Sequence, residues 1–301
     1  MIRLLFFCCA IVCTIPSTAS AQTVSTLGGW FNGSGDVEVA PDGSVWIGNF
    51  GQAVSATGIN GQEVLRMTLD GQSSLVATGF LGASGNAFGP DGSFYQSDIR
   101  NSRVVRIRPN GRVETLIDGN LLAPIGIAVS AEGILYVNEC NTNRISQIST
   151  REASSEADVF VASDMFNCPN GLTMGSDGHL YSVNFSDGRV NRISLPEGDV
   201  TTLATLPGGG NGHVAAANGR LYVTSFAGNR VYEVDLDGTF RVLAGTGEAG
   251  YSDGPASEAL FFNPNGISAS VTGDTLFVNS TALVNSVGGL HPNVLRMIIL
   301  E

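Results

Sequence analysis

The chain of 301 residues is 43% apolar and 14% charged, and it carries a formal net charge of −12 at pH 7. All 15 basic residues are arginines, which excludes Schiff-base chemistry on lysine and the lysine of a phosphate-binding P-loop. Nucleic-acid binding requires clustered positive charge, so the acidic composition argues against a nucleic-acid partner.

The first 21 residues have the pattern of a secretory signal peptide. Arg3 provides the positive start, Leu4–Ile15 an apolar stretch, and Ala19–Ala21 a small-residue cleavage site before Gln22. No later segment has 18 uninterrupted apolar residues, so we expect no membrane insertion. We therefore predict a leader over residues 1–21, a single mature domain over residues 22–301, and a periplasmic or secreted location.

A motif of two apolar runs around a glycine turn occurs six times in the mature chain. The copies occupy Val37–Phe50, Asn86–Ile99, Gly126–Cys140, Gly171–Phe185, His213–Phe226 and Gly266–Ser280. Their turn glycines, 41 to 54 residues apart, are Gly43, Gly92, Gly133, Gly178, Gly219 and Gly273. A repeat of this length built from short strands predicts an all-β fold, a six-bladed β-propeller.

Two further runs of alternating apolar and polar residues follow each of the first five copies, so each blade has four strands, here named a to d. The sixth copy is followed by a strand c at Val294–Leu300 but by no strand d. Thr23–Trp30 has the Val-x-Thr-Leu pattern that also begins the d strands at Val113 and Val200. We predict that this N-terminal strand completes blade 6 and closes the ring.

Three connections are longer than the others. They are the b–c connections of blades 1 and 6, at Gly51–Gln62 and Thr281–Pro292, and the d–a connection into blade 6, at Thr246–Asn263. In a propeller these connections emerge on one face, around blades 6 and 1. They either contact a ligand or cover the closure seam, and the sequence leaves both alternatives open.

The repeats resemble NHL repeats and the six-bladed propellers of the gluconolactonase and regucalcin type. The residues that carry the resemblance are Pro169–Leu172, Pro264–Ile267 and the stretch Gly245–Ala259. The resemblance implies either a hydrolase of a small lactone or ester, or a non-catalytic module that binds a protein or glycan through the long loops.

In the gluconolactonase type, a divalent metal, most often calcium, lies at the tunnel mouth. The resemblance places its ligands at the starts of the a strands, so we expect Asn170, Asn211 and Asn265 as ligands, with Glu139 as a fourth. The Glu of the family pattern in the first blade is missing, and Asp36 lies one residue out of register. The alternative is a water-filled tunnel lined by amides.

The ends of the b strands provide the candidates for proton transfer. Either Glu139 or Asp98 is expected to deprotonate a water molecule that attacks a carbonyl polarised by the metal, and His213 is the alternative base. A streptogramin B lyase-like site would instead require a His at the start of a strand a and a Glu at the end of a strand b. Glu139 meets the second requirement, but Ile125 stands at the position of the His.

Cys140 and Cys168 are the two cysteines of the mature chain. Cys140 ends a strand b, and Cys168 precedes the strand a of the next blade, so both lie on the same face. Because export favours oxidation, we predict a disulfide between them.

Overall fold

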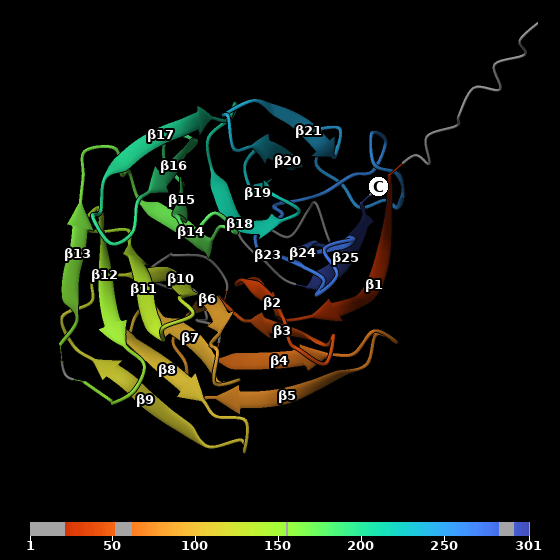
Figure 1. Cartoon of the computed structure of the whole chain (residues 1–301). Helices are drawn as coiled ribbons and strands as arrows, with labels where there is room; N and C mark the ends of the chain where they lie inside the picture. Colours follow the sequence, from red (N-terminus) through yellow and green to blue (C-terminus); the bar gives the residue numbers. More distant parts are fainter. Residues whose placement is uncertain (1–21, 52–61, 155, 283–291, 301) are drawn as a thin grey trace, which may run out of the picture.

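The computed structural model describes residues 22–51, 62–154, 156–282 and 292–300, which form six antiparallel sheets arranged as blades around a central tunnel (Figure 1). The predicted leader and most of two long connections, residues 52–61 and 283–291, fall outside these ranges. Within them, no helix has the length and apolar character needed to cross a membrane.

Blades 1 to 5 each have four strands in the order a-b-c-d. Blade 1 contains β2 (Val37–Val39), β3 (Val45–Gly48), β4 (Glu63–Met67) and β5 (Ser73–Thr78), and blade 2 contains β6 (Ala83–Phe88), β7 (Phe94–Asp98), β8 (Arg103–Ile107) and β9 (Val113–Asp118). Blade 3 contains β10 (Pro124–Val129), β11 (Ile134–Glu139), β12 (Arg144–Ser149) and β13 (Asp158–Ala162). Blade 4 contains β14 (Pro169–Met174), β15 (Leu180–Asn184), β16 (Arg189–Ile193) and β17 (Val200–Thr205), and blade 5 contains β18 (Asn211–Ala217), β19 (Arg220–Ser225), β20 (Arg230–Asp235) and β21 (Phe240–Ala244).

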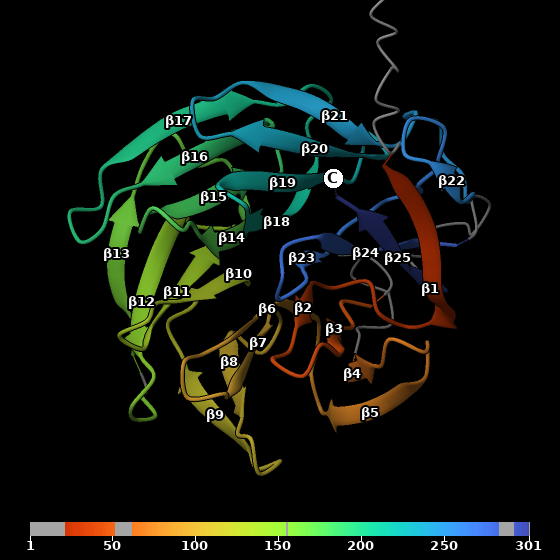
Figure 2. The same cartoon turned by 45° about the vertical axis from the view of Figure 1, so that its right-hand side comes forward.

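The six predicted a–b turns are confirmed. Each turn glycine has φ between +71° and +83°, a conformation that glycine adopts without the steric cost of a Cβ atom. The a strands β2, β6, β10, β14, β18 and β23 lie innermost, and the d strands form the outer edge of the ring (Figure 2).

Blade 6 confirms the predicted ring closure. It contains β23 (Ile267–Ala269), β24 (Thr275–Thr281) and β25 (Asn293–Ile299), and β1 (Thr23–Phe31) pairs antiparallel with β25. In this pairing Val24 lies opposite Ile298 and Thr26 opposite Arg296. The outermost strand is β22 (Gly254–Pro255), which pairs with β1. The N-terminal strand is therefore the d strand that the sixth repeat lacks.

The long connection 246–263 covers the closure seam and is fixed there by Arg296. This arginine is fully buried, donates from Nη1 to Leu260 O at 3.0 Å, and forms an ion pair with Asp253 at 2.8 Å. Asp253 also accepts hydrogen bonds from the backbone N–H and the hydroxyl of Thr26, on β1. This connection therefore covers the closure seam.

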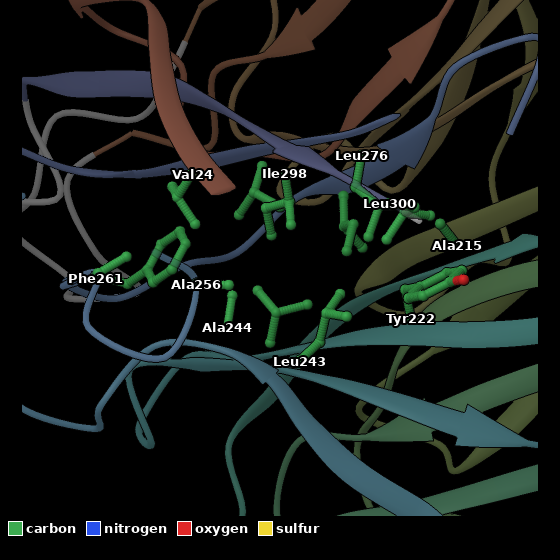
Figure 3. Packing of buried hydrophobic residues seen from close by; sticks show 14 residues of the cluster. Val24, Ala215, Tyr222, Leu243, Ala244, Ala256, Phe261, Leu276, Ile298 and Leu300 are labelled. Carbon is green, nitrogen blue, oxygen red and sulfur yellow. The ribbon is translucent and has the colours of Figure 1, made fainter. Parts of the chain in front are cut away.

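Apolar clusters lie between neighbouring blades, where the alternating side chains of adjacent sheets meet. The cluster between blades 5 and 6 includes Leu243 from β21, Leu276 from β24 and Ile298 from β25 (Figure 3). Val24 from β1 and Phe261 from the covering connection complete it (Figure 3). Closure therefore buries apolar surface as well as pairing the backbone.

A ring of six glycines holds the innermost strands together. One glycine lies within two residues of the start of each strand a, and together they are Gly35, Gly85, Gly126, Gly171, Gly212 and Gly266. A Cβ atom added to any of them would lie 2.1 to 2.7 Å from the backbone of the following blade. Because real Cβ atoms do not approach backbone so closely, any larger residue would push the blades apart.

We expect Gly126→Ala to destabilise the protein by about 3 kcal/mol or more, because its Cβ would lie 2.1 Å from the carbonyl oxygen of Asn170. The matched control is Gly178→Ala, at a turn where a Cβ meets no atom within 4 Å but φ is +82°. That control should lose only about 1 kcal/mol. The measurement is denaturant unfolding of both variants, and equal losses would refute the close-packing argument.

Candidate functional site

Asp98 holds two connections together at the end of β7. Its fully buried carboxylate accepts the backbone N–H of Leu81 at 2.8 Å, from the d–a connection, and the Nε–H of Arg103 at 2.9 Å, from β8. The amide of Asn101 donates to the same carboxylate at 2.8 Å. Asp98 is buried because its carboxylate holds these segments in place. The bonds give no support to the predicted catalytic role.

Glu139 has the same arrangement in blade 3. Its carboxylate accepts the backbone N–H of Leu122 at 2.7 Å, the Nε–H of Arg144 at 2.9 Å and the hydroxyl proton of Ser146. The predicted roles as base and metal ligand are therefore not supported for this residue either. A sequence signal was present: in both blades an arginine follows the acid by five residues, at the first position of strand c.

The predicted disulfide between Cys140 and Cys168 is present. It joins the end of strand b in blade 3 to the connection that enters blade 4. The backbone N–H of Cys168 also donates to the side-chain oxygen of Asn143 at 2.9 Å. This linkage fixes the part of the face that contains Glu139 and the start of β14.

The three predicted amide ligands lie at the starts of strands a, as expected, but two of them link neighbouring blades. Asn170 donates to Asn211 O at 3.0 Å, and Asn265 donates to Ser34 O at 2.7 Å. Asn211 differs from both. Its side chain is fully buried, and neither its amide nitrogen nor its amide oxygen has a hydrogen-bond partner among the described residues.

This donor set does not fit a tightly held divalent cation. The three asparagines are neutral, whereas calcium and magnesium sites in proteins normally include carboxylates. The carboxylate of Glu139 is used in the attachment described above. Among the residues that the structure describes, no group of three or more His, Cys, Asp and Glu side chains could hold a metal ion. The expected calcium therefore has no part in the chemistry proposed for this protein.

The structure instead pairs His213 with Asp36, from two blades that are separated by blade 6. Nδ1 of His213, in blade 5, lies 2.9 Å from Oδ2 of Asp36, at the entry to blade 1. The distance is that of an ion pair, although the contact is not aligned as a hydrogen bond. Oδ1 of Asp36 accepts the backbone N–H groups of Val37 at 2.9 Å and Ile267 at 3.3 Å.

His213 is 1% exposed, and its Nε2 has no partner in the described part of the chain. Sequence reasoning named His213 but missed Asp36 as its partner. Both residues seemed out of register when counted back from the turn glycines. In fact Asp36 directly follows Gly35, and His213 directly follows Gly212. The two residues therefore occupy equivalent positions when the blades are aligned on the ring glycines rather than on the turn glycines.

The residues that follow the six ring glycines form one layer. This layer consists of Asp36, Asn86, Ile127, Leu172, His213 and Ile267, and all six are buried. Five of them, all except His213, also line a cavity of about 410 Å³ that extends to the a–b turn of blade 6. The cavity, which we call the lower cavity, thus lies toward the face opposite the long connections.

Glu38 is a lower-cavity residue that the sequence analysis did not identify. Burial raises the pKa of Glu38 to about 8, and the negative charge of Asp36 contributes to the rise. The hydroxyl of Ser268 donates to Oε2 at 2.9 Å, which opposes the rise. Although the side chain borders the cavity, protein surrounds it closely, so its carboxyl group is mostly protonated at neutral pH.

The sequence of residues 36–244 matches that of a family described as the virginiamycin B lyase family. The chain belongs to this family. The match covers five of the six blades, from Asp36 to the end of β21. The superfamily resemblance stated from the sequence, that of six-bladed propellers of the gluconolactonase type, is confirmed. No curated protein matches the chain in sequence.

Solved structures share the fold at low sequence identity. Virginiamycin B lyase from Staphylococcus aureus is 18% identical, with a TM-score of 0.60 over 88% of this chain and 80% of that one. A gluconolactonase from Xanthomonas campestris is 15% identical, with a TM-score of 0.69 over 93% and 90% of the two chains. An auxiliary nutrient binding protein from Bacteroides ovatus, also 15% identical, has a TM-score of 0.72 over 93% and 77%.

The raised pKa of Glu38 predicts a pH-dependent stability. Between the ordinary pKa of 4.5 and the folded value of about 8, unfolding releases the proton of Glu38, so the free energy of unfolding falls as pH rises. Each pKa unit corresponds to about 1.4 kcal/mol, and contact with cavity water reduces the effect. Between pH 5 and pH 8.5, wild type should lose about 2 kcal/mol more than Glu38→Gln.

Urea unfolding at several pH values measures this difference. Glu258→Gln, which changes an exposed glutamate, is the control and should follow the wild-type pH dependence. Parallel curves for wild type and Glu38→Gln would contradict the raised pKa.

Proposed function

We propose that the protein is an exported enzyme that opens a small lactone or ester in the central tunnel by acid–base chemistry. The observation that carries the proposal is the buried pair of His213 and Asp36, with Nε2 of His213 unpartnered in the described structure. A buried imidazole without a second partner is costly unless a ligand or water molecule completes its contacts. Family membership supports the same chemistry, because the family is named for a lyase.

His213 would act as the general base. The carboxylate of Asp36 beside Nδ1 favours the tautomer with the proton on Nδ1, which leaves a lone pair on Nε2. Nε2 can then take a proton from a water molecule, as in hydrolysis, or from a carbon next to the carbonyl, as in elimination. Asp36 stabilises the imidazolium that forms, because its negative charge lies 2.9 Å away.

Asn211 would stabilise the oxygen of the substrate. It lies two residues before His213 on β18, and its unpartnered amide N–H groups are buried where water does not compete for them. A donor held in such a position stabilises the negative charge that develops on a carbonyl oxygen. Asn170 fixes the strand by donating to Asn211 O.

The test is turnover of aliphatic lactones and p-nitrophenyl esters by the mature protein. His213→Ala and Asp36→Asn should each lower kcat/KM by about 100-fold or more, and Asn211→Ala by at least about 10-fold. His179→Ala, which changes a histidine in the a–b turn of blade 4, is the matched control and should leave turnover unchanged. Wild-type activity in His213→Ala would refute the assignment of the base.

A non-catalytic binding role is the second candidate. Phe185 is 39% exposed and lies 6.1 Å from Phe226, centroid to centroid, and both residues directly follow b strands on the face of the long connections. Exposed aromatic pairs provide stacking surfaces for a glycan or a protein. If wild type converts none of the lactones or esters but binds oligosaccharides, and Phe185→Ala abolishes that binding, this second role replaces the first.

A further inference from the structure

The buried pair of His213 and Asp36 is held by a short segment of the blade that lies between them. This segment, Asn265–Ile267, leads into strand a of blade 6, while His213 belongs to blade 5 and Asp36 to the entry of blade 1. The backbone N–H of His213 donates to Asn265 O at 2.9 Å, and the backbone N–H of Ile267 donates to Oδ1 of Asp36 at 3.3 Å. Because one segment contacts both members of the pair, its position sets their separation.

The middle residue of the segment, Gly266, packs directly against the backbone at Asp36. A Cβ atom at Gly266 would lie 2.8 Å from Asp36 Cα and 2.7 Å from the backbone nitrogen of Val37. Since no side chain fits between these two stretches of backbone, a displacement of the segment would also displace Asp36.

The side chain of Asn279, on β24, ties the segment to blade 1. This side chain is fully buried, and both its oxygen and its nitrogen are hydrogen-bonded. Oδ1 accepts the backbone N–H of Gly266 at 2.7 Å, while Nδ2 donates to Gly33 O at 2.6 Å and to Gly35 O at 2.7 Å. Gly35 directly precedes Asp36, so a single amide fixes the segment relative to the backbone that carries this carboxylate.

The hydroxyl of Thr224, on β19, ties the segment to His213. The pairing of β18 with β19 shifts register between Asn211 and Val214, so the regular ladder is interrupted at His213. The fully buried Thr224 hydroxyl accepts the backbone N–H of His213 at 2.9 Å and donates to Asn265 O at 2.5 Å. It therefore joins His213 to the segment at the point where sheet pairing is missing.

We infer that Asn279 and Thr224 are positioning residues for the acid–base pair: through the segment they fix the distance between Nδ1 of His213 and the carboxylate of Asp36. The inference rests on the proposed function for the role of His213 as the base, but the geometry that it concerns can be measured without a substrate. Because the attraction between the carboxylate and the imidazole depends on their distance, loss of either tie should weaken the preference for the proton on Nδ1.

Asn138 provides a matched control, because it makes the same kind of tie between two blades that do not contain the pair. It is fully buried, and its Nδ2 donates to Asn170 O and to Gly171 O at 3.0 Å, at the entry to blade 4. Loss of this amide should loosen the ring about as much as loss of Asn279, without changing what faces His213. The comparison therefore separates positioning of the pair from general packing between blades.

The experiment is NMR of the mature protein with ¹⁵N-labelled histidine, in which the signals of His213 are assigned by their absence from His213→Ala. A neutral ring fixed in one tautomer gives two widely separated ¹⁵N shifts, whereas exchange between tautomers brings them together. We expect a wide separation in wild type and a clearly smaller one in Asn279→Ala and Thr224→Val. Asn138→Ala and the conservative variant Thr224→Ser should keep the wild-type separation.

Turnover of lactones or esters is the second measurement. In Asn279→Ala and Thr224→Val, kcat should fall by about tenfold while KM stays nearly unchanged, because the base is displaced but the substrate contacts remain. If wild type converts none of the substrates while the tautomer responds as expected, the proposed function fails and the positioning role stands.

Three results would overturn the inference. They are a narrow separation of the shifts in wild type, the wild-type separation in both Asn279→Ala and Thr224→Val, and an equal loss of separation in Asn138→Ala. If Asn279→Ala does not fold, Thr224→Val and Thr224→Ser decide the question, because each changes the side chain by a single group.

Discussion

The contact of backbone on backbone at the six ring glycines determines the rest of this structure. It brings the carbonyl groups at the starts of the a strands into a narrow, dry region, where each must find a donor. Side chains of the preceding blade provide several of these donors: Asn138 donates to Asn170 O at 3.0 Å, and Ser97 donates to Ile125 O at 2.7 Å. Asn279 donates to Gly35 O at 2.7 Å, which extends the pattern from blade 6 to blade 1. The polar residues of the b strands are thus required by close packing of the a strands.

The same constraint determines where the buried pair of Asp36 and His213 and the lower cavity lie. Since glycine has no side chain, the next residue in each blade is the first to contribute one at this level, and these residues form the layer that includes Asp36 and His213. The layer contains three polar residues, Asp36, Asn86 and His213, and three apolar residues, Ile127, Leu172 and Ile267. The buried pair is stable because Asp36 also accepts two backbone N–H groups, which offset the loss of hydration of its charge. Below the layer, Glu38 has no such set of donors, and its pKa rises.

The architecture could be predicted from the sequence, but the candidate site could be predicted only in part. The six glycine turns, the missing d strand of the last repeat and the positions of Cys140 and Cys168 depend on spacing along the chain, which a sequence displays directly. The predicted roles of Asp98 and Glu139 required knowledge of which neighbour each side chain faces. Spacing placed both at the end of a strand b, but Arg103 and Arg144 direct them to the loops. The lower cavity depends on residues from separate blades, and no local pattern marks it.

The two acidic residues of blade 1, Asp36 and Glu38, have different surroundings. The contacts between blades at the ring glycines are made by backbone and by neutral side chains, such as Asn138 and Asn279. In this chain the acidic residues on the tunnel side of blade 1, Asp36 and Glu38, alternate along β2 and its entry with Val37 and Val39. Asp36 contacts His213 and also lines the lower cavity, whereas Glu38 lies two residues further toward the turn and borders the cavity alone. Asp36 contacts His213 and accepts two backbone N–H groups, whereas Glu38 accepts from Ser268 alone among the described residues, so the protein compensates the burial of the two carboxyl groups to different extents.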